Sequence, residues 1–270
     1  MLSHFVQRVC ACSLIAGTGL LAAPAQRPGE LTTEQIVQRA LTRAQRVQEL
    51  KSHTNYSYQK TTVVEELDGK GRVKASKEKL LQVESGVSTL KELKKNGKAV
   101  PLPPQREAEA EAAADRQQVT TSPRTRRDDN WSEYLNKELT ARYTFELVGR
   151  EDVAGRSAYV LTFQPRSDKL PVKQITDRLL NRLAGKVWVD TDEFEVAKAE
   201  IDLLDEVTMW GGVLGAMKKF TFDIERTRVD GVWFNRVSNF EMEGRTLLDG
   251  TRIRVKSEAS NFRKNAALTN

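Results

Sequence analysis

The stretch KFTFDIERTRVDGVWFNRVSNFEMEG, Lys219 to Gly244, decides the fold, because apolar and polar residues alternate on both sides of a central turn. Such alternation is typical of strands, in which successive side chains point to opposite faces of the sheet. Asp230-Gly231 supplies the turn of a hairpin. The apolar residues expected on one face of each arm are Phe220, Phe222 and Ile224, then Phe234, Phe240 and Met242. The stretch therefore predicts two long antiparallel strands.

The same pattern recurs on both sides of this hairpin. Turn sequences at Asp68-Gly69-Lys70-Gly71, Asn96-Gly97, Ala154-Gly155 and Asp190-Thr191-Asp192 each separate two alternating runs. In the run after Gly155, one face carries Tyr159, Leu161 and Phe163. Thr251 to Phe262 reads as the last strand. Consecutive strands joined by tight turns form an antiparallel meander, and a long twisted sheet curls. The sequence therefore predicts a mainly β (α+β) fold over residues 26–270: one large half-open antiparallel barrel of roughly nine to eleven strands.

Few segments read as helices. Leu31–Leu50 has an apolar stripe and a capping box, in which Thr32 and Gln35 satisfy each other's backbone N–H groups. Val172–Leu183 is expected to form an inserted helix, with Gly185 just past its end, and Trp131–Thr140 a shorter one. Residues 101–130 are rich in Ala, Glu, Arg and Pro. We expect them to form an exposed, partly helical excursion, which is either a solvated insertion or a functional charged segment.

The first residues carry the marks of an export signal. Arg8 precedes the apolar run Val9–Ala22, and Ala23-Pro24-Ala25 matches the small-residue pattern of a cleavage site. The alternative is a buried N-terminal helix. We expect cleavage after residue 25 and a soluble periplasmic protein, and no later run is long enough to span a membrane.

Removal of residues 1–25 would limit the kinds of catalytic and metal site that the protein can form. Both cysteines (Cys10 and Cys12) and His4 would leave with the signal, so that His53 would be the one histidine left. We therefore expect no disulfide, no metal site, no cofactor and no enzymatic activity. Asp190, Asp192 and Glu193 suggest a Ca²⁺ loop, but they lack the ligand series of an EF-hand and are more typical of a turn. Acidic and basic residues alternate along the chain, so nucleic acid is not an expected partner.

The order of these elements carries a resemblance. The phrases GREDVAGRSAYVL and GKVWVD, with the closing RVDGVWF, resemble the LolA/LolB-like superfamily of the outer-membrane lipoprotein-sorting type, over most of residues 31–263. The resemblance implies a half-open barrel with an apolar inner surface that carries acyl chains of lipoproteins. Relatives of the RseB type imply an envelope sensor on the same scaffold. This chain departs from the carriers by residues 101–130 and by the helix at 172–183.

An apolar sheet face has to be covered by helices, by other strands or by a ligand. We predict a ligand-binding lining made of Tyr159, Leu161, Phe163, Phe220, Phe222, Ile224, Phe234, Phe240 and Met242. We predict a movable lid formed by the inserted helix and the Gly-punctuated loop that follows Glu206, with Ile175, Leu179, Leu183, Met209, Trp210, Val213, Leu214 and Met217. The alternative is that these residues form a permanent core.

Two functions are compatible with this reading. The first is a periplasmic carrier that binds lipid, an acyl chain or a lipoprotein without catalysis. The second is an RseB-like envelope-stress sensor or scaffold that acts through contacts with an envelope protein.

Overall fold

The structure, a computed structural model, describes residues 30–117, 135–167, 170–173, 175–209, 215–246 and 249–265. The chain divides into two units, Met1–Leu31 and Thr32–Asn270, and all helices and strands of the described residues belong to the second. The export signal expected at residues 1–25 lies outside the described residues. Within the described part of the chain, no helix is long and apolar enough to cross a membrane.

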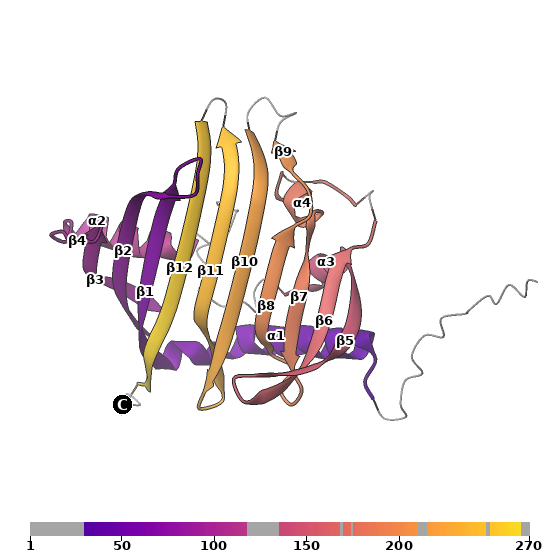
Figure 1. Cartoon of the computed structure of the whole chain (residues 1–270). Coiled ribbons are helices and arrows are strands. Elements are labelled where there is room, and N and C mark those ends of the chain that lie inside the picture. Colours follow the sequence, from indigo (N-terminus) through magenta and orange to yellow (C-terminus); the bar gives the residue numbers. More distant parts are fainter. Residues whose placement is uncertain are drawn as a thin grey trace, which may run out of the picture. The chain divides into compact units, whose positions relative to one another are not determined.

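The described strands form a single antiparallel sheet, as the alternating sequence predicts (Figure 1). Eleven of them follow the order β4-β3-β2-β1-β12-β11-β10-β8-β7-β6-β5, and β9 pairs with β10. Because β4 and β5 lie at opposite edges and do not pair with each other, the sheet fits a half-open barrel. The strands are β1 Tyr56–Leu67, β2 Val73–Glu84, β3 Val87–Lys95, β4 Lys98–Ala99, β5 Tyr143–Val153, β6 Arg156–Pro165, β7 Leu183–Asp190, β8 Val196–Leu203, β9 Val207–Met209, β10 Gly215–Val229, β11 Val232–Thr246 and β12 Asp249–Lys264. The twelve described strands exceed the expected nine to eleven, because two of them, β4 and β9, are too short to be recognised from alternation in the sequence.

The sequence order and the spatial order of the strands differ at two places. The last strand, β12, lies between β1 and β11, with Val64 opposite Val255 and Val255 opposite Phe240. The first and last strands are therefore neighbours in the middle of the sheet. All the other neighbouring strands in this order, except β8 and β10, follow each other along the chain.

The helices pack mainly against one face of the sheet, which we call the inner face. They are α1 Thr33–Leu50, the 3-10 turn η1 Ser52–Asn55, α2 Gln105–Gln117, α3 Lys137–Thr140 and α4 Ile175–Leu180. The predicted capping box of α1 is confirmed, since the Thr32 side chain accepts from the Gln35 N–H and the Gln35 side chain accepts from the Thr32 N–H. Its buried stripe is Ile36, Ala40, Leu41 and Ala44. Figure 1 shows α1 running across the strands.

The segment after Pro101 is more closely attached to the fold than its composition suggests. Its described part forms α2, and Ala112 is buried against Leu81 of β2 and Leu90 of β3. Helix α2 is therefore docked on the sheet through Ala112, although most of its described side chains are exposed. The apolar contacts of α2 come from small side chains, because alanine lets the helix approach the sheet closely and leaves no stripe of large apolar residues to recognise.

Two other boundaries differ from the prediction. The inserted helix α4 ends at Leu180, and Leu183 and Gly185 belong to β7. The short helix α3 begins after Asn136, whose side chain caps it by accepting from the Leu139 N–H. Leu183 continued the helical spacing of Ile175 and Leu179 by coincidence, because β7 begins there with an inner-face residue.

The described ends of the expected loop between Met209 and Met217 are strand residues that pair with each other. Met209 ends β9 and Met217 lies in β10, where it is opposite Val207. Gly215 is paired with Met209. Residues 210–214, which include the predicted lid residues Trp210, Val213 and Leu214, lie outside the described residues.

Candidate functional site

The candidate site is the part of the inner face formed by β5 to β8, β10 and β11, which we call the apolar half. Its centre is Phe222 and Ile224 of β10, which are buried with Val196 and Ala199 of β8. Partly buried Phe220, Phe240, Val187 and Ile201 pack against this cluster, together with Leu135 from the segment before α3. The ring centroids of Phe220 and Phe240 lie 5.4 Å apart in an edge-to-face arrangement. The apolar half is thus a continuous hydrocarbon surface across several strands.

Helix α4 covers one end of this surface. Leu179 of α4, Leu183 of β7 and Met217 of β10 are buried in one cluster. Leu180, Phe220 and Met242 are partly buried against it. The predicted lid residues Leu179, Leu183 and Met217 are therefore brought together, whereas the side chains of Ile175 and Met209 lie outside the described residues. A helix of six residues is the principal cover of this cluster.

Polar contacts attach α4 to the start of β5. Arg142 lies beside Asp177, with Nη2 and Oδ1 2.7 Å apart, and its Nη1 donates to Asn181 Oδ1 over 2.7 Å. Tyr143 Oη donates to the Leu180 carbonyl oxygen over 2.6 Å. Burial raises the pKa of Tyr143 to about 12, against a weaker opposing effect of Arg142. These bonds hold one side of α4 while its apolar residues face the sheet.

The predicted lining residues of β6, which are Tyr159, Leu161 and Phe163, lie outside the cluster centred on Phe222 and Ile224. Phe163 is 5.1 Å from Tyr143 and 6.1 Å from Phe145 between ring centroids, which extends the apolar half toward the β5 edge. Tyr159 stacks on Phe194 with centroids 6.4 Å apart, and Leu161 is almost fully buried.

Phe234 lies outside the cluster of Phe222 and Phe240. It contacts Tyr56 and Phe262, with centroid distances of 5.1 and 4.9 Å. The pairing register of β10 and β11 shifts between Glu225 and Arg226, which separates Phe234 from the regular alternation of Ser238, Phe240 and Met242.

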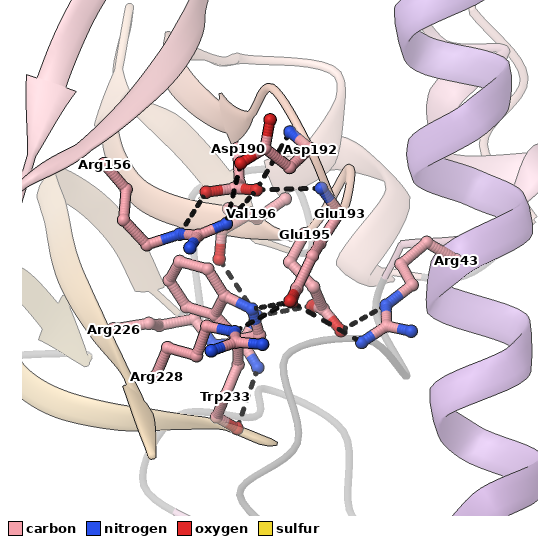
Figure 2. Close-up of polar contacts among 10 residues, drawn as sticks. All are labelled: Arg43, Arg156, Asp190, Asp192, Glu193, Glu195, Val196, Arg226, Arg228 and Trp233. Carbon is pink, nitrogen blue, oxygen red and sulfur yellow. Dashed lines mark hydrogen bonds and ion pairs between the residues drawn. The ribbon is translucent and has the colours of Figure 1, made fainter. Parts of the chain in front are cut away.

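A charged cluster beside the apolar half was not recognised from the sequence (Figure 2). Arg226 is 2% exposed and donates from Nη1 to Glu195 Oε2 over 2.9 Å, and Glu195 is 4% exposed. The other oxygen of Glu195 accepts from Arg43 Nε of α1 over 3.1 Å. Arg226 also donates to the backbone oxygens of Val196 and Trp233. The available signal was an arginine that follows Phe222 and Ile224 at strand spacing.

The turn between β7 and β8 completes this cluster. Asp190 is 1% exposed and binds Arg156 through both carboxylate oxygens, at 2.6 and 2.9 Å, while Asp190 Oδ1 also accepts the N–H groups of Asp192 and Glu193. Glu193 binds Arg228 and the indole N–H of Trp233. Each acid of the turn that is buried or half-buried is therefore matched to a donor, which identifies a structural turn rather than a calcium loop. No group of three or more metal-ligating side chains occurs among the described residues.

Comparison with known proteins gives structural neighbours and no sequence relatives. No protein-family model and no curated protein matches the chain. It is similar to a putative outer membrane lipoprotein-sorting protein domain from Vibrio parahaemolyticus, with 13% identity and a TM-score of 0.32 over 87% of this chain and 95% of the other. It is also similar to a LolA superfamily protein from Nitrosomonas europaea, with 11% identity and a TM-score of 0.29 over 88% and 96%.

A third neighbour is MucB of Pseudomonas aeruginosa in its complex with MucA, with 15% identity and a TM-score of 0.24 over 84% of this chain and 99% of the other. LolA superfamily proteins are thus among the structures that this chain is similar to.

Proposed function

We propose that the protein binds the hydrocarbon chain of a lipid or a lipidated protein on the apolar half and carries it without catalysis. The observation that supports this proposal is the run of apolar side chains across neighbouring strands, with Phe222, Ile224 and Phe240 at its centre and the short helix α4 as cover. The ligand-binding residues predicted from the sequence that meet here are Phe220, Phe222, Ile224, Phe240 and Met242.

The proposed mechanism is an exchange of apolar contacts. Leu179, Leu183 and Met217 shield one another in the closed state. An acyl chain that enters under α4 replaces these contacts, so little apolar surface meets water at any stage. The free energy of binding then depends on the area removed from water, less the cost of moving α4. Release follows when a partner offers a larger apolar surface.

The hydrogen bonds from Arg142 and Tyr143 would keep α4 attached to the start of β5 while the helix moves away from the apolar surface. They connect α4 to the start of β5, beside the apolar contacts and independent of them. Displacing Leu179 from the sheet leaves these polar bonds in place. The side chain of Met217, being unbranched and flexible, can adapt to a hydrocarbon chain in the place of Leu179.

A second candidate function is an RseB-like sensor or scaffold that binds an envelope protein. The exposed charged side chains of α2, Arg106, Glu107 and Glu109, favour it, because they form a polar surface on a helix that is docked and ordered against the sheet. In either case we propose that the protein reaches the periplasm after cleavage of residues 1–25. Mass spectrometry of the mature N-terminus after expression tests that step.

Locking α4 tests the carrier. In a chain with Cys10 and Cys12 changed to Ser, Leu179→Cys and Met217→Cys place two thiols within one buried cluster. Binding of methyl cis-parinarate, a neutral fluorescent lipid, is measured before and after oxidation. We expect the reduced protein to bind and the oxidised protein to lose binding, with recovery on reduction.

The matched control carries Leu179→Cys alone and should bind the probe under both conditions. Equal binding by the oxidised and reduced double variant would show that α4 is not a cover. Absence of binding by the unmodified protein, combined with capture of a specific envelope protein, would favour the sensor.

A further inference from the structure

A row of side chains that crosses most of the inner face changes character in the middle of the sheet. From β10 to β5 the row consists of Ile224, Ala199, Val187, Leu161 and Leu147, each directly opposite the next. From β11 to β2 the same row continues as Ser238, Ser257, Thr62 and Lys79. Directly opposite residues share a sheet face. We call the second group the polar stripe.

The polar stripe is internally bonded and ends in a buried cation. The hydroxyls of Thr62 and Ser257 lie 3.1 Å apart. Lys79 is 1% exposed, and a lysine buried to this degree needs a compensating charge. The carboxylate of Glu111, on α2, lies 3.3 Å from Lys79 Nζ and 2.8 Å from Lys77 Nζ. One anion therefore serves two lysines of the inner face.

The contacts of Glu111 with the two lysines lower its pKa. Desolvation raises the pKa of Glu111, but the hydrogen bond from Lys77 and the charge of Lys79 outweigh it, so that the pKa lies below its usual value. The carboxylate is thus held as an anion at the end of the polar stripe. The apolar contacts that dock α2 come from two small residues, Ala108 and Ala112. The ion pair of Glu111 is therefore a principal link between α2 and β2.

We propose that the ligand is a lipid with an anionic head group, and that the head group takes the place of Glu111 beside Lys77 and Lys79. This inference rests on the proposed function of the apolar half. The side chains of Phe240 and Lys79 lie on strands three positions apart, β11 and β2, a separation of about 14 Å at the usual strand spacing. A lipid whose chain lies on Phe222 and Phe240 can therefore extend its head group along Ser238 and Ser257 to Lys79.

Charge makes this exchange selective. If α2 moves without replacement, the buried Lys79 loses the carboxylate of Glu111 as a counter-charge, which is unfavourable. An incoming carboxylate or phosphate restores the counter-charge, whereas a neutral head group does not. The lysines therefore favour a charged lipid over a neutral lipid with the same hydrocarbon chain.

The test compares cis-parinaric acid with its methyl ester, because the two probes share one chain and differ in charge. We expect the acid to bind about tenfold more tightly, the value of one charge-assisted hydrogen bond. Lys79→Met should lower the affinity for the acid and thereby remove this preference. Lys91→Met, which removes an exposed lysine of β3, should retain the preference.

Variants of α2 test the exchange itself. Glu111→Gln removes the resident anion and should raise the affinity for the acid more than for the ester. Glu109→Gln, on the exposed side of α2, should change neither affinity. Acetate at the concentration of the probe should not compete, since a free anion lacks the chain.

The outcomes separate the two proposals. Equal affinity for acid and ester would overturn the head-group site and leave the carrier function intact, whereas failure of both probes to bind would overturn the carrier function. If Lys79→Met does not fold, salt titration of the unmodified protein decides: added salt should weaken binding of the acid and not of the ester. An equal response of both probes to salt would contradict the proposal.

Discussion

At the residue scale, Asp190 shows how a turn acid becomes part of the fold. Desolvation raises its pKa, but the hydrogen bond from Arg156 and the backbone N–H groups of Glu193 and Asp192 outweigh this effect, so that the pKa lies below its usual value. In the unfolded chain the pKa of an aspartate is about 3.9. A lowered folded pKa means that the carboxylate stabilises the protein above pH 3.9, and that this stabilisation is lost as the pH falls through the folded value.

We therefore predict that Asp190→Asn lowers the free energy of unfolding at pH 7 and that the difference from the unmodified protein shrinks as the pH falls below about 4. Urea denaturation across this range measures it. Asp205→Asn is the control, because the Asp205 side chain is 69% exposed and contacts Arg182 at the surface. A difference that stays constant with pH would contradict this account of Asp190.

Gly185 is a second residue whose role depends on its neighbours. A Cβ atom at this position would lie 1.9 Å from the backbone oxygen of Glu200, on the adjacent strand β8. We predict that Gly185→Ala disturbs the pairing of β7 and β8 and lowers the melting temperature by several degrees, whereas Gly69→Ala, with no atom within 4 Å, has little effect. Thermal unfolding followed by circular dichroism compares them. Equal melting temperatures of the two variants would contradict this role of Gly185.

At the element scale, α1 is attached through a chain of alternating charges. Glu195 lies between Arg43 of α1, which is 27% exposed, and Arg226 of β10, which is 2% exposed. Loss of Arg43 affects a half-exposed ion pair, and such pairs contribute under about 1 kcal/mol. Loss of Glu195 leaves the Arg226 guanidinium buried without its counter-charge, which costs about 3–5 kcal/mol.

We accordingly predict that Glu195→Gln destabilises the protein several times more than Arg43→Gln does, as measured by urea denaturation with an unchanged m-value. The two variants control for each other because they remove opposite partners of one interaction. Similar losses of stability would mean that the helix contact, rather than the buried arginine, dominates.

At the scale of the whole molecule, the central position of β12 sets how the sheet forms. Strand β12 connects β1 with β11 and has to be synthesised before the two can be joined. Val255 of β12, which is 8% exposed, lies opposite both Val64 and Phe240. Contacts at such long separation along the chain slow folding, because loop closure has to precede them.

We predict that Val255→Ala lowers the free energy of unfolding by about 2 kcal/mol, through the loss of buried hydrocarbon between two half-sheets. The equivalent change Val87→Ala, at a residue of β3 that is 61% exposed, should cost under about 0.5 kcal/mol. Chemical denaturation with tryptophan fluorescence measures both. A small cost at Val255 would mean that the two sides of the sheet fold and unfold separately.

The sequence by itself determined the antiparallel fold class, the hairpin turns and the capped first helix, since each depends on residues close together in the chain. Alternation across Phe220, Phe222 and Ile224 fixes a strand, and Asp230-Gly231 fixes its turn. The same local pattern identified the apolar residues that each strand contributes to the apolar half, because residues two apart on one strand share a sheet face.

Only the tertiary structure decided what lies beside these strands. The pairing of β1 with β12, the docking of α2 through Ala112, and the contacts of Glu111 with Lys77 and Lys79 join residues that are distant in sequence. Nothing in local alternation specifies which strand neighbours which, so the polar stripe of Ser238, Ser257, Thr62 and Lys79 could not be recognised before the register was known. The physical reason is that side-chain period is a local property, whereas burial and ion pairing depend on which chain segments meet in space.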